Sequence, residues 1–504
     1  MNKIGAYVSF LLLLVCCLSC SDGKQSEGDT DVSPFDGDFS GDQDGPDNDS
    51  LIVPETLDHY SRSKSLTAGS PYNEFVFDVA ISTTNGSLLL SGFTEGSFAE
   101  YAMKDTMKLS PKCEGRECRD MFLATVSSDI IEPIAQFGWN GETYADDEIA
   151  SMLVDGNMAI LGGAISAIAN CTGLFCQEAV LVGYDYKDKV VNTMLYEMGK
   201  GLIPDPIVNV LRPPTRITSM THGVFSEIYI AGWVIGDIYG DPGQLTEESY
   251  GQDVFVRKID TATWGNRWVV QLRTPQNESA DAIFLLSDGG IVVAGTTRGD
   301  MCAGSLKETV DRDIFFARYD GDGNLLSCRQ VLTAEDEIVG AATELNGRII
   351  LIGTRRAFDA LSKGSVVITE FDPADDTTTS RLLPETTGIK ISAATQMNQK
   401  VFLAAGAVEH CVVDDKEKDF PCLVMIQMDD TYTELSRRYF GRKQNERIAK
   451  VIVHDDRSIS IVGDALTIIP GGKSNRDIWY EKWVVKDQLT ARLPATILSP
   501  FYSK

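Results

Sequence analysis

The fold is decided by a repeated pattern that is clearest in Asp288-Gly289-Gly290-Ile291-Val292-Val293-Ala294-Gly295: a turn, then an apolar run rich in β-branched residues, then a glycine. Six more runs of this kind end at a glycine, at residues 87–92, 158–162, 228–232, 349–353, 401–406 and 458–463. Successive glycines are 53 to 70 residues apart. Repeats of this length are typical of radial or stacked β-architectures, because one small sheet cannot bury both of its faces alone.

Each repeat shows the same order of expected elements. A first strand, as at 281–286, is followed by a turn and by the run that ends in glycine. Turns such as Asn85-Gly86 and Asn346-Gly347 are strong hairpin signals. After a variable insertion, a third strand alternates in polarity, as at 313–320, and a fourth closes the repeat. Four antiparallel strands make one propeller blade, so we expect an all-β, seven-bladed β-propeller.

Two segments carry a resemblance to a known family. Residues 313–326 (DIFFARYDGDGNLL) and 288–297 (DGGIVVAGTT) resemble the consensus of the bacterial β-propeller-repeat lipoproteins, which are seven-bladed. The resemblance covers all seven repeats but is clear only in the third to fifth. It implies a fold more than a function, because propellers serve many activities.

The ends of the chain are expected to meet in one blade. Residues 59–66 read as a fourth strand that lacks the three strands before it. We expect this strand to pair with the final repeat, at 479–494, and so to remove an exposed sheet edge. The alternative is an open, curved array of sheets.

The N-terminus has the features of an export signal. Lys3 precedes an apolar stretch at 8–15, which has signal-peptide length and is too short to span a bilayer. Leu18-Ser19-Cys20 resembles a bacterial lipoprotein processing box, although Cys17 stands where leucine is usual. The resemblance implies cleavage after residue 19, lipid on Cys20 and an outer-membrane lipoprotein, periplasmic or surface-facing; the alternative is an ordinary secretory signal and a soluble periplasmic protein. Acyl chains would anchor the protein by burying methylene groups.

Residues 20–56 are expected to be a disordered tether between the anchor and a propeller at 57–504. Asp, Gly, Ser and Asn dominate there, and no apolar period supports a folded segment. Alternating carboxylates at 36–49 could instead bind calcium, although the spacing is not that of an EF-hand loop. We expect no other cofactor.

Eight cysteines beyond Cys20 fit an oxidising compartment. The phase of the repeat favours four local disulfides, since most of the cysteines fall in pairs within single insertions. The rival interpretation, zinc bound by cysteines with four residues between them, lacks histidine support because the chain has only four histidines. The expected disulfides are Cys113–Cys118, Cys171–Cys176, Cys302–Cys328 and Cys411–Cys422.

No catalytic constellation is evident. His59, His222, His410 and His454 lie in unrelated places, and the chain has no phosphate-binding glycine motif. The net charge of −28 argues against nucleic acid as a partner.

Residues just ahead of the first strands form the first candidate site. First strands are innermost in a propeller, so these residues should gather at one mouth of the central channel. A mixed-charge ring there could bind a polar ligand or a cation, or could be a solvated rim. The candidate residues are Asp78, Asp147, Asp281, Asp336, Arg216, Lys390 and Arg447.

The insertions form the second candidate site, which we call the insertion rim: residues 96–119, 164–178, 233–252, 297–312 and 407–421. Loops on a rigid scaffold commonly carry recognition. We therefore expect a non-enzymatic propeller of the cell envelope whose disulfide-braced loops bind a protein or a carbohydrate. One alternative is an enzyme, a hydrolase, lyase or quinoprotein, acting at the channel mouth. Another is a scaffold similar to the outer-membrane assembly lipoproteins, whose turn-then-tryptophan pattern residues 260–268 faintly resemble.

Overall fold

The structure is a computed structural model. The chain divides into two units, Met1–Ser50 and Leu51–Lys504, and all described residues belong to the second. The described residues are 60–69, 72–96, 119–127, 130–137, 147–165, 177–197, 214–236, 238, 251–302, 311–356, 363–408, 411–413, 416–418, 422–440, 445–455, 458–468 and 474–485.

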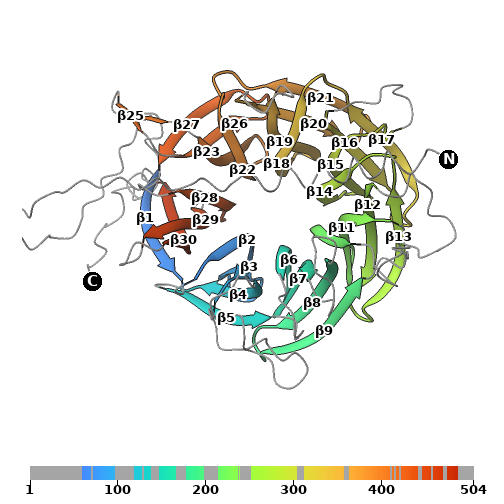
Figure 1. The fold of residues 1–504 in the computed structure, drawn as a ribbon, viewed down its shortest axis with the longest axis horizontal. Coiled ribbons are helices and arrows are strands. Elements are labelled where there is room, and N and C mark those ends of the chain that lie inside the picture. Colours follow the sequence, from blue (N-terminus) through green and yellow to red (C-terminus); the bar gives the residue numbers. More distant parts are fainter. Residues whose placement is uncertain are drawn as a thin grey trace, which may run out of the picture. The chain divides into compact units, whose positions relative to one another are not determined.

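Seven four-stranded antiparallel sheets are arranged as the blades of a propeller, as the repeats predict (Figure 1). Blade 1 comprises β2 (Glu74–Ile81), β3 (Leu88–Thr94), β4 (Asp120–Val126) and β5 (Ile131–Phe137). Blade 2 comprises β6 (Glu148–Asp155), β7 (Met158–Ile165), β8 (Glu178–Asp185) and β9 (Val190–Glu197). Blade 3 comprises β10 (Thr215–His222), β11 (Glu227–Ile235), β12 (Gln252–Asp260) and β13 (Gly265–Leu272). Blade 4 comprises β14 (Glu278–Leu285), β15 (Ile291–Thr297), β16 (Asp313–Tyr319) and β17 (Leu325–Val331). Blade 5 comprises β18 (Asp336–Leu345), β19 (Arg348–Arg356), β20 (Ser365–Asp372) and β21 (Thr377–Leu382).

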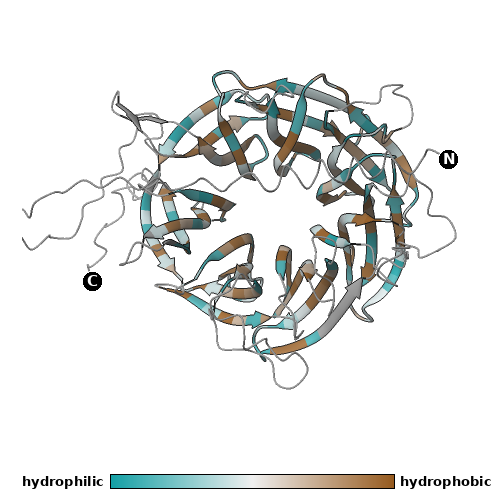
Figure 2. Cartoon of the chain, in the orientation of Figure 1, coloured by the Kyte–Doolittle hydropathy of each residue, from teal (hydrophilic) through white to brown (hydrophobic). Residues whose placement is uncertain are grey.

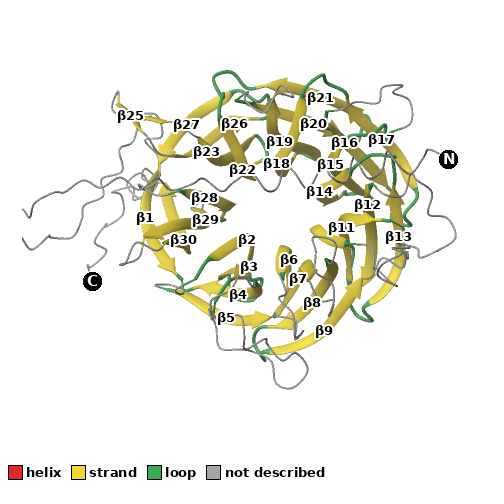
Figure 3. Ribbon diagram, in the orientation of Figure 1, coloured by secondary structure: helices red, strands yellow, loops and turns green. Residues whose placement is uncertain are grey.

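The last two blades complete the ring. Blade 6 comprises β22 (Ile389–Asn398), β23 (Val401–Val408), β26 (Cys422–Asp429) and β27 (Glu434–Phe440), with a small hairpin, β24 (Cys411–Val413) and β25 (Lys416–Lys418), inserted between β23 and β26. Blade 7 comprises β28 (Glu446–Val453), β29 (Ile459–Ile468), β30 (Ser474–Val485) and β1 (Tyr60–Ala68). The described residues contain strands, turns and loops and no helix (Figure 3).

The ring closes as the sequence predicts, because the first described strand completes the last blade. β1 pairs antiparallel with β30, from Tyr60 opposite Val485 to Ala68 opposite Ile478. The Arg62 guanidinium donates to the Glu481 carboxylate at 2.9 Å, and Arg438 of blade 6 donates to the Tyr60 carbonyl at 2.9 Å. The outer strand of blade 7 is therefore held by its own blade and by its neighbour.

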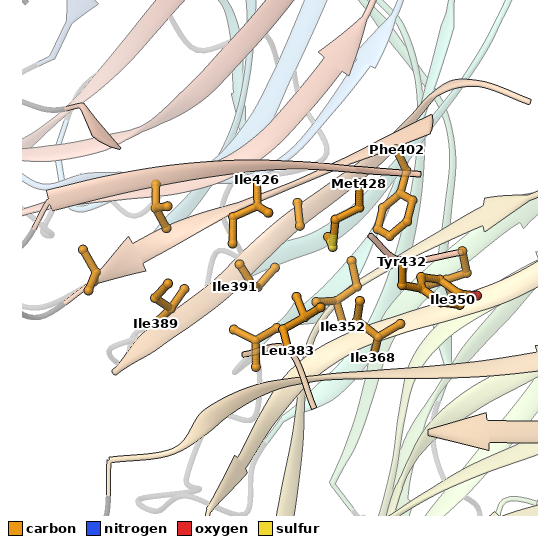
Figure 4. Packing of buried hydrophobic residues seen from close by; sticks show 14 of the residues in the cluster. Ile350, Ile352, Ile368, Leu383, Ile389, Ile391, Phe402, Ile426, Met428 and Tyr432 are labelled. Carbon is orange, nitrogen blue, oxygen red and sulfur yellow. The ribbon is translucent and has the colours of Figure 1, made fainter. Parts of the chain in front are cut away.

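The hydrophobic core lies between the blades. Seven clusters of buried apolar residues each combine side chains from two adjacent blades. The cluster in Figure 4 joins Ile350, Ile352 and Ile368 of blade 5 to Phe402 and Met428 of blade 6. Each blade thus buries one face against each neighbour, which is why a single repeat would not fold alone.

Burial falls from the middle strands to the outer strands. Every residue of β15 is buried, whereas β21, with sequence TTTSRL, is exposed or half-buried throughout. Hydrophobic and hydrophilic bands alternate along many strands (Figure 2). Trp268 and Trp483 pack in the clusters between blades.

The glycines that end the apolar runs are required by a β-bulge in the facing first strand. In all seven blades the first strand carries one extra residue, directly after the residue that pairs with the glycine. A Cβ at the glycine would lie 1.8 to 2.3 Å from a carbonyl oxygen of that strand. The seven glycines are Gly92, Gly163, Gly232, Gly295, Gly353, Gly406 and Gly463. In blade 2 the equivalent glycine is Gly163, one residue beyond the run end at 162 that the sequence suggests.

The predicted hairpin turn between the first two strands of blade 5 is confirmed. Asn346 and Gly347 both have positive φ, 55° and 75°, between β18 and β19. This is the combination that two-residue turns with the twist of a β-hairpin require.

Candidate functional site: the central cavity and the base of the insertion rim

The first strands of all seven blades line one central cavity of about 460 Å³. Small side chains form much of the wall, including Ala150, Ala282 and Ala393, together with larger apolar groups such as Phe77 and Phe284. The charged residues among the described lining residues are Asp78, Asp281 and Lys450. The surface exposed to the cavity is mostly polar, and three charged groups lie on it.

The bulges of the first strands open onto this cavity. Because each bulge lies at the same register opposite a glycine, the ring of blades brings the seven extra residues to one level. All seven line the cavity: Phe77, Ala150, Thr218, Asp281, Gly340, Ser392 and Ala449. The identity of the bulged residue therefore sets the chemistry of the wall, blade by blade.

Several bulged residues also bond to the next blade. The Thr218 hydroxyl donates to the Ala280 carbonyl of blade 4, and the Ser392 hydroxyl donates to the Ile448 carbonyl of blade 7 at 2.7 Å. In blade 5 the position is Gly340, where a Cβ would lie 1.9 Å from the Ile391 carbonyl oxygen. The equivalent carbonyl of blade 1, on Val76, accepts from Arg447 of blade 7. These contacts fix neighbouring blades to one another around the cavity.

Asp78 is engaged by donors from three blades. Its carboxylate accepts from the Lys450 ammonium of blade 7 at 2.8 Å and from the Met152 amide of blade 2 at 2.8 Å. A third bond, at 2.9 Å, comes from the amide of Val79 in its own strand. The Asp78 charge raises the pKa of Lys450, which burial by itself would lower.

Asp281 is in a different situation. Among the described residues, the hydrogen bond to its carboxylate comes from the Ser279 hydroxyl at 3.5 Å. Burial raises its pKa to about 7, and Ser279 and the more distant Arg312 oppose this only in part. Arg312 itself is bonded through two nitrogens to Asp336, at 3.1 and 2.8 Å. Asp281 is therefore a desolvated carboxyl group that faces the cavity and has no bonded cation among the described residues.

The structure separates the seven predicted mouth residues into several registers. Asp78 and Asp281 line the cavity, whereas Asp147 is completely buried at the start of β6 and Asp336 is bound to Arg312. The four acidic residues stand at different positions relative to the bulges, so that Asp78 and Asp281 line the cavity and the other two do not. The basic residues Arg216, Lys390 and Arg447 do share a register, two positions before the bulged residue.

Two of those basic residues are held by carboxylates. Arg216 forms an ion pair with Glu148 of blade 2. Arg447 donates to the buried Asp464 at 2.7 and 2.9 Å, and its guanidinium lies 4.9 Å from the ring centre of Phe77. Their charges are compensated within the described structure.

The sequence predicted one of the seven bulged residues, Asp281, and missed the other six together with Lys450. Lys450 lies in a strand in which polar and apolar residues alternate, and a lysine in such a strand is ordinarily predicted to be solvent-exposed. The signal for the bulges was the glycine itself, because a glycine in a buried strand indicates close approach of another backbone.

A buried polar network fixes the base of the insertion rim in blades 1, 3 and 4. In blade 1 the Gln136 amide nitrogen donates to the Asp120 carboxylate at 2.8 Å and to the Gly96 carbonyl at 2.9 Å. In blade 3 Gln271 makes the same two bonds to Asp253 and Gly236, each at 2.7 Å.

Blade 4 repeats this network. Gln330 donates to Asp313 at 3.1 Å and to the Gly299 carbonyl at 3.0 Å. The amide oxygens of the glutamines also accept from the insertions: that of Gln271 from the Ile238 amide and that of Gln330 from the Met301 amide, both at 3.0 Å. We call this arrangement the Asp–Gln–Gly brace; it ties the insertion to the third and fourth strands of its own blade.

Burial shifts the pKa of two acidic groups at this level. It raises the pKa of Asp120 to about 6, with the Gln136 bond opposing the shift. It raises the pKa of Glu278 to about 7, opposed by bonds from Thr274 and Thr297. The base of the insertion rim therefore contains carboxyl groups that are poorly solvated.

A disulfide strengthens one of the braces. Cys302 is bonded to Cys328 of β17, as expected, directly beside Met301. Cys422 is also disulfide-bonded. The side chains of Cys411, Cys113, Cys118, Cys171 and Cys176 lie outside the described residues, as do Cys20, the tether and the proposed calcium segment.

The described residues offer no metal site or membrane-spanning helix. No group of three or more histidine, cysteine or acidic side chains among them is arranged to hold a metal ion. Within the same residues, no helix has the length and hydrophobicity needed to cross a membrane.

No protein-family model matches the chain, and its sequence matches no curated protein. Among solved structures, it is similar to a protein of unknown function from Dyadobacter fermentans (10% identity, 85% of this chain and 100% of that chain covered, TM-score 0.42). It is also similar to the endosialidase of phage phi92 (8% identity, 88% and 71% covered, TM-score 0.43) and to a Trypanosoma rangeli sialidase (10% identity, 84% and 58% covered, TM-score 0.36). Similarity at this level concerns the fold alone and gives no indication of this chain's activity.

Proposed function

We propose that the chain is a non-enzymatic binding protein of the bacterial cell envelope, anchored through lipid on Cys20, whose insertion rim holds a protein partner. The observation that carries the proposal is the Asp–Gln–Gly brace, repeated in three blades at the base of the insertions. Buried, bonded carboxylates at a loop base restrict the loop's entry geometry, and pre-organised loops lose less entropy on binding.

The placement of the insertions favours a protein over a small carbohydrate. Five blades carry an insertion between the second and third strands, and these connections leave every blade on the same side. A stable protein interface needs roughly 800 Å² from each partner, and five insertions together would supply such an area more readily than one. A carbohydrate partner is the alternative outcome of the experiment below.

The cavity supports binding more than catalysis. Asp78 is engaged by three donors, one of which is Lys450, so a substrate would have to break these contacts to reach either side chain. Acid–base mechanisms commonly use two groups with different proton affinities. Among the described lining residues, Asp281 alone has a carboxyl group without a close cation.

Site-specific photo-crosslinking in intact cells tests the proposal. Benzoylphenylalanine at Tyr239, within the 233–252 insertion, is expected to trap a protein; the same probe at Asp322, in the exposed turn between β16 and β17, is the control. Equal trapping at both positions, or trapping of lipid and peptidoglycan alone, would refute a protein partner at the rim. Trapped glycan would identify the carbohydrate alternative.

A matched pair of variants tests the role of the brace. Gln271→Ala removes the bonds to Asp253 and Gly236 and is expected to weaken capture at Tyr239 severalfold. Gln396→Ala, at an exposed site near the far end of β22, is expected to leave capture unchanged. Intact mass spectrometry of the purified mature protein tests the anchor: acyl mass on Cys20 is expected, and its absence would refute lipid anchoring.

A further inference from the structure

We propose that the central cavity binds a small organic cation, an aliphatic amine whose ammonium group pairs with the Asp281 carboxylate. This site is separate from the insertion rim and does not depend on the function proposed for it.

The charged groups of the cavity are distributed unequally around the ring. Asp78 and Lys450 neutralise each other at the junction of blades 1 and 7. Blade 4, which carries Asp281, is three blades away from each of these, so the Lys450 ammonium is on the far side of the ring. An ionised Asp281 therefore gives the cavity a negative charge that Arg312 attracts from a distance but to which no cation of the described residues is hydrogen-bonded.

The charged side chains of the neighbouring strands form ion pairs with one another and not with Asp281. In β18, Asp336 and Glu337 face arginines of their own: Arg312 bonds to Asp336, and Arg355 bonds to Glu337. On the β10 side, Arg216 is paired with Glu148. Within β14 itself, Ser279 gives a weak bond to the Asp281 carboxylate, and Glu278 accepts from two threonines.

The cavity has room beside Asp281 for the alkyl body of an amine. Phe284 of the same strand and Met220 of blade 3 contribute apolar side chains to a lining whose exposed surface is otherwise mostly polar, and alanines leave room between them. A metal ion would need several oxygen ligands, and the described residues supply no such group. An anion would have to compete with Asp78 for Lys450. The volume of about 460 Å³ lies in the range of small-molecule sites.

Isothermal titration with n-butylammonium chloride at pH 8 and 150 mM NaCl tests this site, with 1-butanol and butyrate as neutral and anionic probes of similar size. Saturable one-to-one binding is expected for butylammonium alone. Asp281→Asn should weaken it at least tenfold. The matched control Asp322→Asn, which removes an exposed carboxylate elsewhere, should change it less than twofold. Salt at this concentration screens non-specific attraction to an acidic protein.

Two further measurements keep the inference falsifiable if Asp281→Asn alters the fold. Ala150→Leu places an isobutyl group in the cavity from blade 2 and leaves Asp281 intact, so it should also weaken binding. At pH 6, about one unit below the pKa of about 7 for Asp281, the affinity should fall roughly tenfold, because most of the carboxyl is protonated. Equal binding of butanol, or binding unaffected by both cavity variants, would overturn the proposal.

Discussion

The ammonium nitrogen of Lys450 lies 2.8 Å from the Asp78 carboxylate, and this contact joins the last blade of the ring to the first across 372 residues of chain. The same carboxylate accepts from the Met152 amide of blade 2. One side chain thus holds three consecutive blades at the point where the ring closes. Pairing of β1 with β30 joins the two ends of the chain at the outer edge of blade 7, and the contact between Asp78 and Lys450 joins blade 1 to blade 7 at the cavity.

Replacing the two partners of this contact should have unequal effects on stability. Asp78→Ala removes the ion pair and leaves two buried amides without acceptors, so we expect a loss of about 3 kcal/mol. Lys450→Met leaves the carboxylate with two amide donors and keeps the aliphatic stem, so we expect about 1 kcal/mol. Urea unfolding measures both, with the exposed Asp322→Ala as control. If Lys450→Met lost more stability than Asp78→Ala, the hydrogen bonds from the two amides to Asp78 would contribute little.

The glycine opposite each bulge should tolerate no side chain. At Gly295 a Cβ would lie 1.9 Å from the Ser279 carbonyl oxygen, and the backbone must move to admit it. We expect Gly295→Ala to cost about 3 kcal/mol or more. Gly321→Ala is the matched control, because its Cβ would meet its nearest atom at 3.5 Å. Both variants lose the same flexibility in the unfolded chain, so the difference between their urea midpoints isolates the clash.

Most of the fold could be predicted because its determinants are local and repeated. Asn346-Gly347 fixes a hairpin from two adjacent residues, and each run such as 291–295 marks a buried second strand. The closing strand at 60–68 could also be predicted, because its sequence resembles the fourth strand of a repeat and no first, second and third strands precede it. The propeller follows from seven such units, each of which must bury two faces.

The site could be predicted only in part because it depends on register between strands far apart in the sequence. A bulge shifts all following residues by one position, so counting from the start of a strand does not tell which side chain reaches the cavity. Asp281 was predicted because it stands at the start of the apolar run 281–286, and in the structure it is the bulged residue. Lys450 was missed because its partner, Asp78, is 372 residues away.

Removal of residues 60–68 should disrupt the ring. Without β1, the edge of β30 is unpaired and Trp483 loses part of its cover, so we expect aggregation and a lower melting temperature. Removal of residues 21–56 should leave the melting temperature unchanged. Size-exclusion chromatography with light scattering, combined with thermal melting, distinguishes the two deletions. A synthetic peptide of residues 57–69 added during refolding should restore the monomer of the first; a stable monomer without the peptide would refute closure by this strand.

The Cys302–Cys328 bond should stabilise the protein and the fourth-blade insertion. The bond links residues 26 apart, and chain entropy gives roughly 3 kcal/mol for such a loop. We expect the double variant Cys302→Ser, Cys328→Ser to lose stability of this order. Hydrogen exchange should also rise at the Met301 amide, which bonds to Gln330, and not at the Ala317 amide within β16. Unchanged exchange at Met301 would mean that the Asp–Gln–Gly brace holds the insertion without the disulfide.

The partly buried Asp281 should make the protein less stable as the pH rises. Burial raises its pKa from 3.8 to about 7 in the folded state, so the unfolded chain ionises first. Stability is then lost as the pH rises from about 4 to about 7, and the loss is complete above that range. Asp281→Asn removes this penalty, and we expect its melting temperature to exceed that of the unaltered protein at pH 8, with the difference shrinking towards pH 4. Other buried carboxyls, such as Glu278, titrate in both proteins and cancel in the comparison. A difference that is independent of pH would mean that the Asp281 carboxyl titrates normally and that the cavity is well solvated around it.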